Sequence, residues 1–133
     1  MRLNGLFLIV ALCALPIAAS AQDAAPPPDA TAPNPLQRQA VIDLAYVLGE
    51  AHALHRVCAG PEDNTWRARM GRLLQVEKPD AAYRQRLMES FNGGFTARHA
   101  EFPTCTLKTA EMERTVAARG RTLSRHLASG VLP

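Results

Sequence analysis

Apolar residues recur at a helical period along most of this chain, and proline interrupts that period at three positions. The breaks are Pro61, which follows Gly60, and then Pro79 and Pro103; they divide the chain after residue 35 into four segments. Within each segment apolar residues return every three or four positions, without the sustained alternation typical of a strand. The spacing therefore predicts an all-α domain, a small four-helix bundle.

The helix boundaries follow from these breaks and from residues that cap helices. We expect a first helix over about residues 36–57, ended by Gly60 and Pro61. The other three should end near residues 78, 100 and 129. Their candidate capping residues are Asp63, Asn64 or Thr65 for the second helix, Asp80 for the third and Thr106 for the fourth.

The third segment contains Asn92-Gly93-Gly94, which can be interpreted in two ways. The glycines either break the helix or mark a point of close packing inside a helix that continues to about residue 100. Phe95, Arg98 and Phe102 keep the helical phase, which favours continuation.

The first helix carries apolar residues on two opposite faces. Val41, Leu44 and Leu48 belong to the main stripe. A helix with two apolar faces is either central in a bundle or meets a partner, and central placement is the simpler expectation. The second stripe consists of Ile42, Tyr46, Ala53 and Val57.

The start of the chain has the pattern of an export signal. Arg2 precedes an apolar run over residues 6–18, and Ala19-Ser20-Ala21 fits the small-x-small cleavage rule. We expect a signal peptide over residues 1–21, cleaved after Ala21, and a periplasmic or secreted protein without a transmembrane span. An uncleaved anchor and a lipoprotein signal at Cys13 are weaker alternatives.

Residues 22–35 are rich in proline and alanine and predict a disordered linker before a helical domain over residues 36–130. The linker is either a passive spacer or a tether.

Cleavage would remove Cys13 and leave Cys58 and Cys105. Two cysteines in an exported chain predict one disulfide. If the disulfide forms within one chain, closing the loop between Cys58 and Cys105 adds about 3–4 kcal/mol to the free energy of unfolding on the chain-entropy estimate. The sequence leaves open whether the bond forms within one chain or between two.

Four strings of residues, in order, resemble a known family. They are Leu48-Gly49-Glu50-Ala51-His52-Ala53-Leu54-His55-Arg56-Val57-Cys58, Trp66-Arg67-Ala68-Arg69-Met70, Phe91-Asn92-Gly93-Gly94-Phe95 and Cys105-Thr106. Over about residues 44–110 the chain resembles an uncharacterised family of small exported helical proteins of alphaproteobacteria. The resemblance implies a periplasmic helical domain with Cys58 paired to Cys105, and it implies no activity.

One cluster has the composition of a metal or ligand site. Glu50, His52, His55 and Cys58 lie within one helix, and side chains three residues apart are neighbours. Glu50 projects away from both histidines, however, and a disulfide would occupy Cys58. The favoured interpretation is a packed His55 in the apolar stripe with His52 at its boundary, and no cofactor.

Arginine dominates the 15 basic residues, and Arg114, Arg121 and Arg125 share one face of the last helix. This face is either simply solvated or binds anionic lipid, cell-wall polymer or an acidic partner. Nucleic acid is an unsuitable ligand, because the net charge is only +3 and aromatic residues are not interleaved with the basic ones.

Catalytic motifs are missing from the sequence: there is no His-Glu-x-x-His, phosphate-binding glycine loop, Gly-x-Ser-x-Gly or Cys-x-x-Cys. We therefore expect a non-enzymatic interaction module that binds an unknown envelope protein. The alternative is a small-ligand or metal-binding protein that uses Glu50, His52 and His55. The candidate interaction surface consists of Ile42, Tyr46, Val57, Arg114, Arg121 and Arg125.

Overall fold

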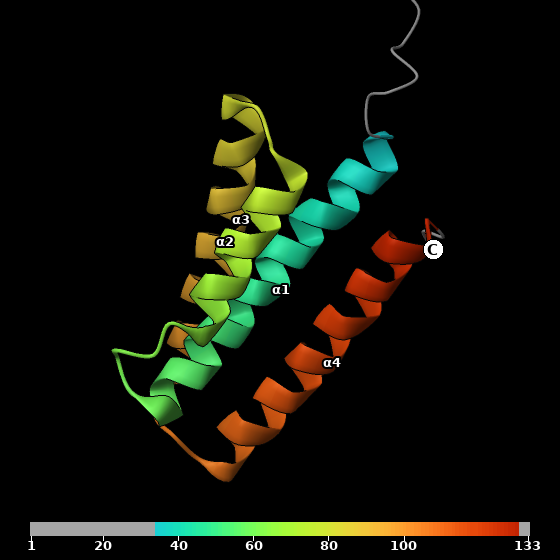
Figure 1. Ribbon diagram of the computed structural model, residues 1–133. Helices are drawn as coiled ribbons and strands as arrows, with labels where there is room; N and C mark the ends of the chain where they lie inside the picture. Colours follow the sequence, from blue (N-terminus) through green and yellow to red (C-terminus); the bar gives the residue numbers. More distant parts are fainter. Residues whose placement is uncertain (1–33, 131–133) are drawn as a thin grey trace, which may run out of the picture. The chain divides into compact units, whose positions relative to one another are not determined.

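The computed structural model describes residues 34–130, which form four helices and contain no strand (Figure 1). The all-α prediction is confirmed for this part of the chain. The predicted signal peptide and residues 22–33 of the predicted linker lie outside the described residues. The helices are α1 (Pro35–Ala59), α2 (Thr65–Glu77), α3 (Ala81–Glu101) and α4 (Leu107–Ser129).

Helix α1 is the centre of the bundle. Each of the other three helices packs against it, and α3 does so most extensively. Figure 1 shows α1 running between α4 on one side and α2 and α3 on the other, with successive helices alternating in direction. Both of its apolar faces are used within the domain, since Val41 of the main stripe and Ala53 of the second stripe are almost fully buried. The prediction that the first helix is central is therefore confirmed.

Helix α3 continues without a break through Gly93 and Gly94. A Cβ atom on Gly94 would clash with the carbonyl oxygen of Tyr46 in α1, and one on Gly49 in α1 would clash with that of Phe91 in α3. These glycines let the two backbones approach one another, which explains why this pair has the most extensive contact. The interpretation as close packing within a continuous helix is confirmed.

Local capping explains where α1, α3 and α4 begin. Helix α1 starts at Pro35, a favoured first position, and the Asn34 side chain accepts a hydrogen bond from Leu36 N at 2.9 Å. Asp80 caps α3 by accepting from Tyr83 N at 2.8 Å, and Thr106 caps α4. The predicted caps of α3 and α4 are thus confirmed.

The predicted disulfide is present and lies within one chain. It joins Cys58, in the last turn of α1, to Cys105, which directly precedes the cap of α4. The bond fixes the C-terminal end of α1 to the start of α4. Within residues 34–130, none of the helices is both long and apolar enough to cross a bilayer.

Candidate functional site

Helices α2 and α4 both pack on α1 and leave an open groove between them. Two adjoining hollows, of about 590 Å³ and 550 Å³, make up the groove, and Leu44, Leu48, Arg69 and Ser124 line both. Leu44 and Leu48 come from the central helix and supply an apolar base. We call this feature the arginine groove, because its edges carry Arg69 and Arg72 of α2 and Arg121 and Arg125 of α4.

The two edges of the arginine groove are similar in length. The lining of α2 extends from Trp66 to Glu77, and that of α4 from Ala117 to Ala128. At 1.5 Å per residue each stretch measures about 16 Å. The groove therefore has the length of about three turns of a helix.

The groove is strongly basic. Within residues 34–130, no carboxylate forms an ion pair with any of its four arginines. The Arg69 guanidinium lies 4.8 Å from the centre of the Trp66 ring, and Arg125 donates to the Thr122 hydroxyl at 3.2 Å. Glu77 lies at one end, where burial raises the pKa of its carboxyl group. The groove thus combines an apolar base with uncompensated positive charge.

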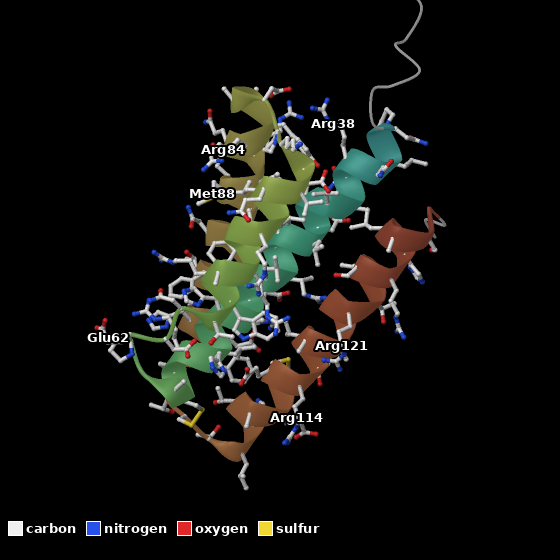
Figure 2. All side chains as sticks on the ribbon, in the orientation of Figure 1. Arg38, Glu62, Arg84, Met88, Arg114 and Arg121 are labelled. Atoms are coloured by element: carbon white, nitrogen blue, oxygen red, sulfur yellow. A yellow bond between two sulfur atoms is a disulfide. The ribbon has the colours of Figure 1, made fainter. Side chains whose placement is uncertain are left out.

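The predicted interaction surface is divided between two sides of the bundle. Arg121 and Arg125 line the arginine groove, while Arg114 is exposed on α4 and lines neither hollow (Figure 2).

The apolar members of that predicted surface lie on the α3 side. The Ser90 hydroxyl in α3 donates to the carbonyl oxygen of Ile42 at 2.8 Å, and the Tyr46 ring lies beside Gly93. Val57 lines a separate hollow of about 270 Å³ together with Phe95. Ile42, Tyr46 and Val57 are all partly exposed, but they pack along α3 rather than forming one patch with the arginines.

Glu50 is a buried charge that joins three helices. Its side chain is 3% exposed, and its Oε1 accepts from Arg98 Nε of α3 at 2.9 Å. The guanidinium of Arg119 in α4 pairs with its other oxygen. A buried carboxylate needs such partners, because desolvation otherwise makes its charge very costly. Glu50 therefore connects α1 to both α3 and α4.

His52 is the buried histidine of α1. It is only 1% exposed; its ring stacks on Phe91 at 5.7 Å and lies 5.5 Å from the Phe95 ring. Neither ring nitrogen has a hydrogen-bond partner among the described residues. Burial, followed by the nearby charges of Arg67 and Arg56, lowers the pKa of His52 to about 4. His52 is therefore neutral at ordinary pH.

His55 is only partly buried and has polar partners. Its Nδ1 lies 2.7 Å from Glu113 Oε1 of α4, and its Nε2 lies 3.5 Å from Asp63 Oδ1. The expectation of a packed His55 and a boundary His52 is therefore wrong. The reason is the placement of the neighbours: aromatic rings of α3 cover His52, whereas carboxylates approach His55.

The comparison with known families gives one match. A family model described as "Protein of unknown function (DUF2385)" matches residues 35–130. This chain belongs to the DUF2385 family. The match covers all four helices and both bridged cysteines, so the resemblance to an uncharacterised family is confirmed. No curated protein matches the chain, and no solved structure matches it.

The candidate metal or ligand residues do not converge in this DUF2385 domain. Glu50 is paired with arginines, His52 is packed among aromatic rings and His55 is paired with carboxylates. Cys58 is held in the disulfide and therefore supplies no thiolate ligand for a metal. In the part of the chain that the structure describes, no group of three or more metal-binding side chains occurs.

The sequence pattern did not identify the α2 edge of the groove in the DUF2385 domain. The sequence has arginines at positions 67, 69 and 72, but only the packing of α2 and α4 on α1 places Arg69 and Arg72 opposite Arg121. The local signal that was available is the presence of arginines on both helices. That signal cannot by itself indicate which helices are neighbours.

Proposed function

We propose that this protein is a non-enzymatic binding module of the cell envelope. The arginine groove receives an acidic amphipathic helix of a partner protein. The single observation that carries the proposal is the groove itself, an apolar base bounded by four arginines without carboxylate partners.

The dimensions of the groove support a helical partner. Edges of about 16 Å match about three turns of a partner helix, which would present apolar side chains at positions i, i+3 or i+4, and i+7 to the base. Leu44, Leu48 and Leu73 would contact those side chains. Burying each large apolar side chain contributes about 1.5–3 kcal/mol before the cost of association.

The charge of the groove supports an acidic partner. Glutamate or aspartate side chains at the borders of the partner helix would pair with Arg72 on one edge and Arg121 on the other. Arginine forms bidentate hydrogen bonds with carboxylates, which adds orientation as well as attraction. Complementary charge also accelerates encounter and disfavours partners of the wrong sign.

A protein helix is a better match than a lipid surface or cell-wall polymer. The apolar base lies between two helices, and a planar bilayer presents no ridge to enter it. Exposed arginines outside the groove, including Arg114, would contribute to an anionic surface equally well, so a lipid interaction would not depend on the groove.

The location of the partner in the proposal rests on the sequence of residues 1–21. An export signal would bring the module outside the cytoplasm, where a disulfide such as Cys58–Cys105 persists. The absence of recognised catalytic motifs in the sequence supports a binding role rather than an enzymatic one. A metal or small-ligand role for Glu50, His52 and His55 together has less support, because their partners differ.

Site-specific photocrosslinking in the native host tests the proposal. The photoreactive residue p-benzoylphenylalanine replaces Ser124, which is exposed and lines both hollows, or, as the control, Arg84, which is exposed on α3 (Figure 2). We expect one protein to crosslink from position 124 and not from position 84. Mass spectrometry should place the crosslink in a segment with acidic residues and apolar residues at helical spacing.

Two results would contradict the proposal. The first is crosslinking of equal yield from both positions. The second is a crosslink from position 124 to lipid or cell-wall polymer alone, which would support the anionic-surface interpretation instead.

A further inference from the structure

A second basic hollow lies between α1, α2 and α3. Its volume is about 270 Å³, and its lining includes His52 and Arg56 of α1, Arg67 of α2, and Asn92 and Phe95 of α3. Arg67 and Arg69 are two residues apart and therefore project from different faces of α2. This hollow is thus separate from the arginine groove.

The hollow is bordered by buried polar atoms of two side chains that have no hydrogen-bond partner among the described residues. Both ring nitrogens of His52 and the Nε of Arg56 are buried and unpartnered among the described residues. Because His52 is neutral, one of its nitrogens carries a hydrogen that it can donate. Buried polar groups without partners are uncommon and costly, so they point to a ligand that satisfies them.

Positive charge in the hollow is also uncompensated. Arg56 and Arg67 form no ion pair within residues 34–130, although both lie close enough to His52 to lower its pKa. Asp63 is close enough to His52 to oppose the lowering of its pKa. Its carboxylate, however, accepts a hydrogen bond from Thr65 N at 3.0 Å and lies 3.5 Å from His55 Nε2, so it does not pair with Arg56 or Arg67.

We infer that this hollow binds a small oxyanion, a carboxylate or phosphate group, between Arg56 and Arg67. The two guanidinium groups hold the oxygens, the Asn92 amide donates a further hydrogen bond, and the N–H of His52 lies at the base. Guanidinium groups bind such planar or tetrahedral oxyanions in bidentate fashion. The volume is below that of a drug-sized ligand site, which restricts the ligand to a small anion or the anionic group of a small metabolite.

Nuclear magnetic resonance on the purified, oxidised protein tests this inference without knowledge of the natural ligand. The imidazole signal of His52 is followed at pH 7 while sodium phosphate, sodium succinate or sodium chloride is added at matched ionic strength. We expect a saturable shift with phosphate, succinate or both, and none with chloride. Phosphate alone would assign a phosphate group as the ligand chemistry, and succinate alone a carboxylate.

The Arg67→Gln variant supplies the decisive comparison. Arg67 is exposed, so the substitution leaves the core intact. We expect binding at least tenfold weaker, while the matched Arg84→Gln variant on α3 binds as the unmodified protein does. The inference is overturned if neither anion shifts the His52 signal beyond the chloride control, or if Arg67→Gln binds as tightly as the unmodified protein.

Discussion

Replacing Gly94 by alanine should destabilise the protein, although alanine is the better helix former. A Cβ at this position would clash with the Tyr46 carbonyl oxygen and lie 3.0 Å from Glu50 N. Both neighbours are backbone atoms, so no change of rotamer relieves the contact. Helices α1 and α3 must therefore move apart.

The expected magnitude follows from the side chains that this interface buries. Tyr83, Leu87 and Phe91 of α3 are at most 7% exposed, and burial of each contributes about 2 kcal/mol. A gap of about 0.5–1 Å forfeits roughly a quarter to a half of the dispersion energy, which for these three side chains is a loss of about 1.5–3 kcal/mol. Overpacking strain adds to this loss, and the higher helix propensity of alanine offsets about 1 kcal/mol. The net destabilisation should be about 2 kcal/mol.

Gly71→Ala is the matched control, because Gly71 lies within α2 and a Cβ there would meet no atom within 4 Å. This variant should gain about 1 kcal/mol from helix propensity alone. Urea unfolding followed by circular dichroism, with the disulfide intact, measures both variants. If Gly94→Ala is as stable as the unmodified protein, or is stabilised as Gly71→Ala is, the account of close packing between α1 and α3 is wrong.

Three further predictions concern stability. Glu50→Gln should cost about 2 kcal/mol in urea unfolding, because it removes the buried charge that pairs with both Arg98 of α3 and Arg119 of α4. Glu101→Gln, which removes only the exposed ion pair of Arg98, should cost less than about 0.5 kcal/mol. Replacing both Cys58 and Cys105 by serine should cost about 3–4 kcal/mol, visible as a lower melting temperature that no longer depends on reductant. The unfolded chain takes up a proton on His52 near pH 6.5 and the folded one only near pH 4, so stability should fall by about 3 kcal/mol as the pH drops between these values. His52→Phe should lose that part of the pH dependence, and an unchanged profile would contradict the buried neutral state.

The helices were predictable because their signals are local. Pro61, Pro79 and Pro103 fix the interruptions, and Asp80 and Thr106 mark helix starts by their own side-chain chemistry. The two apolar faces of α1 correctly indicated a central helix. A disulfide of Cys58 and Cys105 was also predictable, since only two cysteines remain after the predicted cleavage, but the structure was needed to place it within one chain.

The environments of the charged residues were not predictable, because they depend on the neighbouring helix. His52 and His55 are three residues apart, yet one meets the Phe91 ring of α3 and the other meets Glu113 of α4. Glu50 is buried only because arginines from two distant segments reach it. The arginine groove likewise depends on the separation of α2 from α4, which no local pattern encodes.

Charge reversal in the arginine groove tests the central claim most directly. Arg72→Glu combined with Arg121→Glu reverses one charge on each edge, and Arg84→Glu with Arg86→Glu makes the same change in net charge on α3. Photocrosslinking from position 124 should fall at least tenfold in the groove variant and stay unchanged in the α3 variant. Equal yields in the two variants, whether both high or both low, would contradict binding of an acidic partner in the groove.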